Sequence, residues 1–100
     1  MEFIDKFNRR IKLTEESWNH IVEMHPELKE MLKELVGALE DPELIKRSLY
    51  NENVVLFYRY YGHIYEGKHM CVIVRLDEES IVTAYITDRI KKGEVVWEKN

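Results

Sequence analysis

The sequence predicts an α+β domain in which two to three N-terminal helices pack on one face of a roughly four-stranded antiparallel β-meander. Two observations predict this fold class. Apolar residues recur at helical spacing in the first half of the chain, and runs rich in valine, isoleucine and aromatic residues follow in the second half. The 100 residues can build one hydrophobic core but are too few for two, so residues 1–100 are expected to form a single domain.

The helical part spans residues 12–48 and opens with Thr14 as the expected N-cap. One face of the first helix carries Trp18, Ile21, Val22 and His25. Pro26 should end this helix, because the residue before a proline disfavours the α region, and Pro26 can itself open the next helix. The apolar stripe of that second helix comprises Leu28, Met31, Leu32, Leu35, Val36 and Leu39.

Residues 40–48 predict one or two further short helical turns, with Asp41 as cap and Pro42 in the first turn. Strands are then predicted at 53–61, 68–76 and 80–88, with a short last strand in "EVVWEK".

Alternation along the strands assigns the two faces of the sheet. The face toward the helices should hold Met70, Val72, Val74 and Leu76 of one strand, and Val82, Ala84 and Ile86 of the next. The open face should collect His69, Cys71, Ile73 and Arg75, together with Ile81, Thr83, Tyr85 and Thr87. For the strand at 53–61 both alternating sets suit a core, so Arg59 joins the open face in only one of two alternatives.

The amino-acid composition limits the classes of protein to which the chain can belong. With 45% hydrophobic and 34% charged residues, the chain should be globular and soluble. No apolar run approaches the roughly 18 residues that span a membrane, and the first ten residues do not resemble a signal peptide. Cys71 stands alone and cannot form an internal disulfide, so we expect a cytoplasmic protein.

The net charge of −4 argues against a whole-body electrostatic grip on nucleic acid. Residues 14–52 hold four basic against ten acidic residues, which leaves a neutral or basic working face elsewhere in the chain. The open sheet face then has two interpretations. It is an ordinary solvated face, or it is a surface on which arginine and lysine bind phosphates and tyrosines stack on bases.

The histidines favour acid–base chemistry over metal binding. His20 and His25 are five residues apart, about 140° around a helix, and no further cysteine or histidine completes a zinc pattern. We therefore expect no metal and no cofactor. RNA cleavage by the ribose 2′-hydroxyl needs a base, an acid and a cation for the phosphate, and the chain supplies all three residue types.

Three segments within residues 9–97 resemble a known family: "RRIKLTEESWNHIVEMHPEL", "LFYRYY", and "VTAYITDRIKKGE" with a tryptophan after it. They are similar to the phage-associated nuclease-like domains of the barnase–EndoU–colicin–RelE (BECR) superfamily. The resemblance implies N-terminal helices on a four-stranded antiparallel sheet and metal-independent RNA cleavage, sometimes as a toxin or phage effector. It assigns the helical histidines to His20 and His25, the strand cation to Arg59, and the polar strand positions to Thr83, Tyr85 and Thr87.

The resulting hypothesis is a metal-independent endoribonuclease that cuts RNA by acid–base transesterification. Its expected partners are RNA and, for a toxin, an antitoxin or other protein. The predicted catalytic residues are His20, His25, Arg59 and Thr83, and the predicted substrate-binding residues are Tyr85, Thr87, Arg75, Arg89 and Lys91. The alternatives are a noncatalytic module that binds protein or nucleic acid on the same fold, and a domain with an idle ancestral site.

Overall fold

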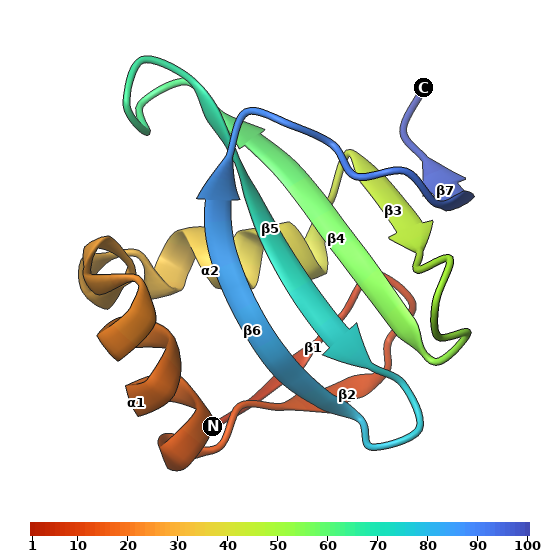
Figure 1. Cartoon of the computed structure of the whole chain (residues 1–100), viewed down its shortest axis with the longest axis horizontal. Coiled ribbons are helices and arrows are strands. Elements are labelled where there is room, and N and C mark those ends of the chain that lie inside the picture. Colours follow the sequence, from red (N-terminus) through yellow and green to blue (C-terminus); the bar gives the residue numbers. More distant parts are fainter.

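The chain folds into one curled sheet with two α-helices on its inner side (Figure 1). The computed structural model describes all 100 residues and confirms the α+β class. In chain order the elements are β1 (Glu2–Ile4), β2 (Arg10–Lys12), α1 (Glu15–Met24), the 3-10 helix η1 (Pro26–Glu30), α2 (Leu32–Glu40), β3 (Leu44–Arg47), β4 (Val54–Tyr61), β5 (Lys68–Arg75), β6 (Ser80–Thr87) and β7 (Glu94–Glu98).

The sheet has seven strands in the order β1-β2-β6-β5-β4-β3-β7, so the predicted number of four is wrong. The predicted meander is present as β4, β5 and β6, which pair antiparallel. The sheet is mixed, because β2 pairs with β6 in parallel. The expected last strand exists as β7, but it crosses to the far edge and pairs with β3 instead of extending the meander.

The N-terminal hairpin of β1 and β2 is a feature that the sequence did not predict. Its turn is organised by Asp5, whose buried carboxylate accepts hydrogen bonds from the backbone N–H groups of Phe7 and Arg9 at 2.9 Å and from Arg9 Nε at 2.7 Å. Strands of three residues carry too little alternation to be recognised by pattern.

The short helical turns predicted for residues 40–48 are also wrong, because Leu44–Arg47 is a strand. A helix of four residues would leave most of its backbone groups unpaired, whereas β3 bonds to β4 on one side and to β7 on the other. Ile45 of β3 is fully buried in the core.

The helices follow the predicted signals with one difference. Thr14 Oγ1 accepts the N–H of Ser17 at 3.0 Å as the N-cap, and α1 ends before Pro26. The second helix is not continuous: η1 precedes α2, and Met31 lies between them with a non-helical backbone. Leu28, Leu35 and Leu39 of the predicted stripe are completely buried. Neither helix is long and apolar enough to cross a membrane.

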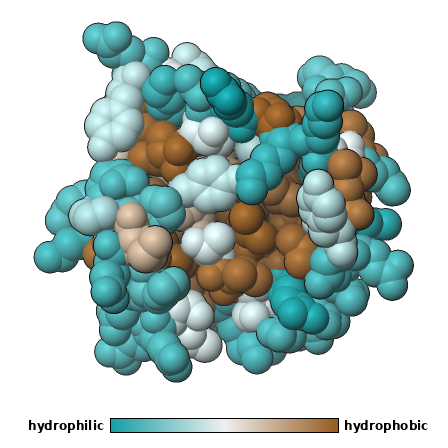
Figure 2. All heavy atoms as spheres, viewed as in Figure 1, coloured by the Kyte–Doolittle hydropathy of each residue, from teal (hydrophilic) through white to brown (hydrophobic).

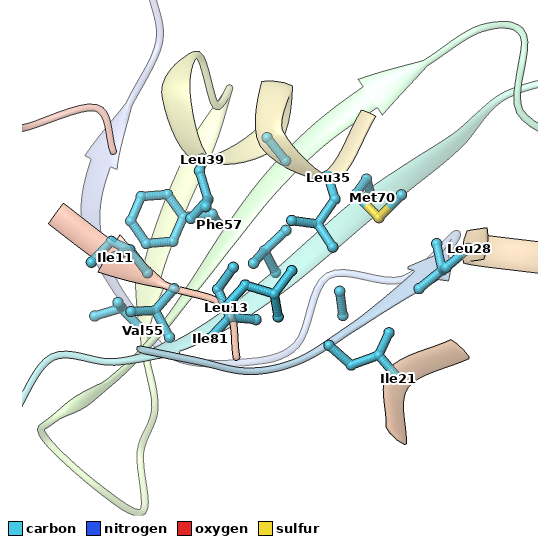
Figure 3. Close-up of a cluster of buried hydrophobic side chains, with 14 of the residues drawn as sticks. Ile11, Leu13, Ile21, Leu28, Leu35, Leu39, Val55, Phe57, Met70 and Ile81 are labelled. Carbon is cyan, nitrogen blue, oxygen red and sulfur yellow. The ribbon is translucent and has the colours of Figure 1, made fainter. Parts of the chain in front are cut away.

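The core fills the inner side of the curled sheet, between the strands and the helices (Figure 3). Leu35 and Leu39 of α2 meet Phe57 and Met70 of the central strands, and β2 adds Ile11. The two ends of the strand order approach each other, since Lys6 Nζ after β1 lies 4.4 Å from the centre of the Trp97 ring in β7. The sheet therefore wraps around the core.

A β-bulge in β6 changes which residues face the core. Ile73 is opposite Thr83 but Val74 is opposite Ile81, so Val82 is the extra residue. Ile81 is consequently buried with 2% of its surface exposed, and Val82 is 47% exposed. The sequence-based faces of these two residues are therefore wrong, while Ala84 and Ile86 face the core as predicted.

The outer face is defined here as the sheet surface turned away from the helices. The structure decides which face of β4 is turned to the core. Val55 and Phe57 lie in the core, and Arg59 and Tyr61 share their side of the strand. The outer face therefore comprises Val54, Leu56, Tyr58 and Tyr60 of β4, His69, Cys71, Ile73 and Arg75 of β5, and Thr83, Tyr85 and Thr87 of β6. The alternative that places Arg59 on this face is wrong.

Candidate functional site

Three residues in register across the central strands form the middle of the outer face. Tyr58, Cys71 and Tyr85 are direct neighbours on β4, β5 and β6. Burial raises the pKa of Tyr58 to about 12 and the pKa of Cys71 to about 11, and it also raises the pKa of Tyr85. All three groups are therefore neutral at physiological pH. Cys71 is a packed thiol and not an activated nucleophile.

Two polar atoms on this face are buried without a hydrogen-bond partner. They are the hydroxyl of Tyr85 and Nδ1 of His69, and the only third such atom in the chain is Arg47 Nε. The Tyr58 hydroxyl and the Cys71 thiol lie close enough to affect the ionisation of Tyr85, but not in hydrogen-bonding geometry. Unpartnered buried polar atoms are uncommon in native proteins and mark places where a function is worth seeking.

Two histidines belong to this part of the outer face. His25, at the end of α1, has its ring centre 6.2 Å from that of Tyr85, and its Nδ1 is 3.8 Å from Glu27 Oε1. His69 is on β5 directly opposite Thr87, with its ring 5.4 Å from that of Tyr60. The His25 ring therefore approaches Tyr85 itself, whereas the His69 ring packs against Tyr60 and Tyr58 of β4 on the same face.

The chain from Asp88 to Gly93, called the strap here, crosses from β6 to β7 at the other end of the sheet (Figure 1). At its start the Thr87 hydroxyl accepts the N–H of Arg89 at 3.0 Å and donates to the carbonyl of Arg89 at 3.2 Å. At its end Gly93 approaches β3 so closely that a Cβ would lie 2.5 Å from the Arg47 carbonyl oxygen. Both ends of the strap are thus fixed.

Lys91, in the middle of the strap, lies over the outer face. Its ammonium is 5.7 Å from the centre of the Tyr85 ring, and its backbone N–H donates to the Tyr58 hydroxyl at 3.2 Å. Lys46 Nζ donates to the Lys91 carbonyl at 3.1 Å. These contacts place a cation above the Tyr85 ring. We call the group of His25, His69, Tyr85 and Lys91 the outer-face site.

Arg59 belongs to a different place, a groove of about 850 Å³ between α2 and the end of β4. Its guanidinium is 3.7 Å from Asp41 Oδ2 and 3.5 Å from the Gly37 carbonyl oxygen. In the same groove His63 Nε2 is 3.1 Å from Glu34 Oε2, and the Tyr61 hydroxyl donates to the Glu34 carbonyl at 2.8 Å. Arg59, Tyr61 and His63 of this α2 groove therefore each have a polar partner within the fold.

The structure therefore gathers some of the predicted residues and separates others. His25, Thr83, Tyr85, Thr87, Arg89 and Lys91 lie on or beside the outer face. His20 is instead exposed on α1 in a depression lined by Glu15, Glu16 and Glu23. Arg59 lies on the opposite side of the sheet, and Arg75 is hydrogen-bonded to Asp77, which raises the pKa of Arg75.

His69 is the residue that sequence reasoning placed correctly on the open face but left without a role. Alternation along β5 was the signal for its face. Its position opposite Thr87 depends on the strand register, which the sequence did not reveal.

Two further findings concern metal binding and similarity to known proteins. No group of three or more histidine, cysteine, aspartate or glutamate side chains could hold a metal ion. No known protein family, curated protein or solved structure matches the chain.

Proposed function

We propose that the protein is a metal-independent endoribonuclease whose catalytic centre is the outer-face site. The observation that carries this proposal is the convergence on Tyr85 of the His25 ring, at 6.2 Å between ring centres, and of the Lys91 ammonium, at 5.7 Å from the ring centre, with His69 on the same face opposite Thr87. A base, an acid and a cation on one face are what transesterification of RNA requires. The motif resemblance to the BECR nucleases leads to the same activity.

In the proposed reaction the scissile phosphate rests against Tyr85, below Lys91. His25, whose Nδ1 lies 3.8 Å from Glu27 Oε1, removes the proton from the ribose 2′-hydroxyl. The 2′-oxygen then attacks phosphorus, the bond from phosphorus to the 5′-oxygen breaks, and His69 gives its proton to that oxygen. The products are a 2′,3′-cyclic phosphate and a 5′-hydroxyl.

The Tyr85 hydroxyl and the Lys91 ammonium stabilise the negative charge of the phosphate in this mechanism. Because burial raises the pKa of Tyr85, its hydroxyl keeps its proton and donates a hydrogen bond to a phosphate oxygen. Lys91 compensates the negative charge that grows on phosphorus oxygens in the transition state. The Thr87 hydroxyl is already bonded to Arg89, so Thr87 positions Arg89 and leaves the phosphate to the other groups.

The α2 groove is the weaker candidate for the same reaction. Arg59 and His63 each already have an acidic partner, Asp41 and Glu34, and a phosphate would have to displace these contacts. The surrounding carboxylates would also repel an anionic substrate. In our proposal Lys91 takes the role that the resemblance gave to Arg59, and His69 takes the role that it gave to His20.

The test is cleavage of a mixed RNA pool by purified protein in the presence of EDTA. We expect products with 2′,3′-cyclic phosphate ends and no cleavage of DNA, which lacks the nucleophile. His25→Ala and His69→Ala should each slow cleavage by about a hundredfold, the usual contribution of one acid–base group. His20→Ala and His63→Ala are matched controls from outside the site, and they should cut at the wild-type rate.

Melting temperatures measured on the same four variants separate loss of chemistry from loss of fold. Intact RNA after incubation with the wild-type protein would overturn the nuclease proposal, and so would parent rates in both outer-face variants. Binding of RNA without cleavage would favour the alternative of a noncatalytic binding module.

A further inference from the structure

A hollow of about 210 Å³ lies on the outer face beside the site, between the strap and the turn that joins β3 to β4. Its floor is apolar and is formed by Val54, Leu56 and Ile73. Tyr50 stands on one side and Lys91 and Lys92 on the other. Figure 2 shows the apolar patch in the middle of this face, with hydrophilic residues around it.

Tyr50 has an exposure that packing does not explain. Its side chain is 96% exposed, and the neighbouring Leu49 is 63% exposed. The turn that carries them is held by its own hydrogen bonds: the N–H of Ser48 donates to the Val54 carbonyl at 2.9 Å, and the N–H of Tyr50 donates to Ser48 Oγ at 3.1 Å. The backbone of the turn is therefore held in place, while the Tyr50 ring is solvent-exposed and takes no part in the core.

The hollow combines an aromatic ring, an apolar floor and two cations, which is the chemistry that binds single-stranded nucleic acid. Its volume is below the roughly 300–1,000 Å³ of pockets for drug-sized ligands, so one heterocyclic base suits it better than a larger molecule. We propose that this hollow holds the unpaired base of the nucleotide next to the cleaved phosphate in single-stranded RNA. The inference rests on the function proposed above.

Lys91 joins the hollow to the outer-face site. It lines the hollow, its ammonium lies over the Tyr85 ring, and its N–H is bonded to the Tyr58 hydroxyl. A base stacked on Tyr50 would bring its phosphate to this lysine, and the adjacent Lys92 would meet the next phosphate along the strand. A base in a duplex cannot enter the hollow, because its faces are covered by its neighbours in the stack.

The experiment measures binding separately from cleavage. A fluorescein-labelled single strand of 2′-deoxynucleotides lacks the nucleophile, so its anisotropy reports binding without turnover. Tyr50→Ala should weaken binding about tenfold, which is within the range for loss of one base–aromatic stack, and Tyr50→Phe should restore it. Tyr65→Ala is the matched control, since Tyr65 is 59% exposed in the turn at the other end of β4, and it should bind like the wild type. The same sequence as a duplex should bind more weakly than the single strand.

The outcomes distinguish this inference from the proposed catalysis. Wild-type affinity in Tyr50→Ala would overturn the inference even if the protein cuts RNA. An equal loss in Tyr65→Ala, or a wild-type protein that does not bind the single strand, would overturn it as well. Loss of binding in Tyr50→Ala alone would uphold the hollow as a site for an unpaired base even if the wild-type protein leaves RNA uncut, in which case the catalytic proposal and the place of that base next to a cleaved phosphate fail.

Discussion

Replacing Tyr85 with phenylalanine should leave the fold at least as stable as the wild type while it slows RNA cleavage. The hydroxyl of Tyr85 is buried and has no hydrogen-bond partner. A buried polar group in that state costs about 1–3 kcal/mol, and the packing of the hydroxyl oxygen against the nearby Cys71 thiol and Tyr58 hydroxyl is lost with it. We therefore expect the free energy of unfolding to rise by between zero and about 1 kcal/mol.

Cleavage should respond in the opposite direction. If the hydroxyl donates to a phosphate oxygen in the transition state, its removal should lower kcat by about a hundredfold, as for other preorganised donors. Urea unfolding followed by circular dichroism gives the stability, and cleavage of a labelled RNA gives the rate. The two measurements must be made on the same preparation.

Tyr58→Phe is the matched control for this prediction. The Tyr58 hydroxyl accepts the N–H of Lys91 at 3.2 Å, so its loss should destabilise the protein by about 1 kcal/mol. Opposite signs of the two stability changes would support the assignment of Tyr85 to function. A loss of more than about 1 kcal/mol in Tyr85→Phe would refute the reasoning, because it would show that this hydroxyl makes a structural hydrogen bond.

Two further predictions test the packing beneath the site. Ile81→Thr should destabilise the protein by about 1–3 kcal/mol and Val82→Thr by less than about 0.5 kcal/mol, because the bulge buries Ile81 and exposes Val82. Equal urea midpoints for the two variants would contradict the bulge. The free energy of unfolding should also fall as the pH rises from 9 to 11, because burial raises the pKa of Cys71 to about 11 and only the unfolded chain ionises its thiol in that window. Cys71→Ala should reduce this fall. The same pH profile in Cys71→Ala and the wild type would contradict this prediction.

The parts of the fold that the sequence predicted are those with strong local patterns. Thr14 and Pro26 mark the ends of α1 by their backbone chemistry, and the pattern of β5 is unambiguous because one face is wholly apolar. β3 was missed because Asp41 and Pro42 imitate a helix start, while the backbone partners that make the segment a strand lie far away in sequence. The bulge at Val82 depends in the same way on the partner strand.

The candidate site could not be predicted in full from the sequence, because it depends on the strand register and on the path of the strap. Alternation alone left Arg59 undecided, because both faces of β4 are rich in apolar and aromatic residues. Helical spacing placed His25 on the apolar face of α1 and His20 off it, but it did not show that the ring of His25 reaches Tyr85. Lys91 was predicted as a basic residue after the last long strand, but its position over Tyr85 follows from the path of the strap across the sheet.

The four histidines of the chain allow a direct test of where a phosphate binds. His25 and His69 belong to the outer-face site, whereas His63 lies in the α2 groove and His20 in the acidic depression on α1. The decisive measurement is the NMR spectrum of the histidine rings during titration with the 2′-deoxy single strand. If the phosphate binds at the outer-face site, the ring signals of His25 and His69 shift while those of His20 and His63 stay in place. Shifts of His63 or His20 without shifts of the outer-face pair would contradict this placement of the phosphate.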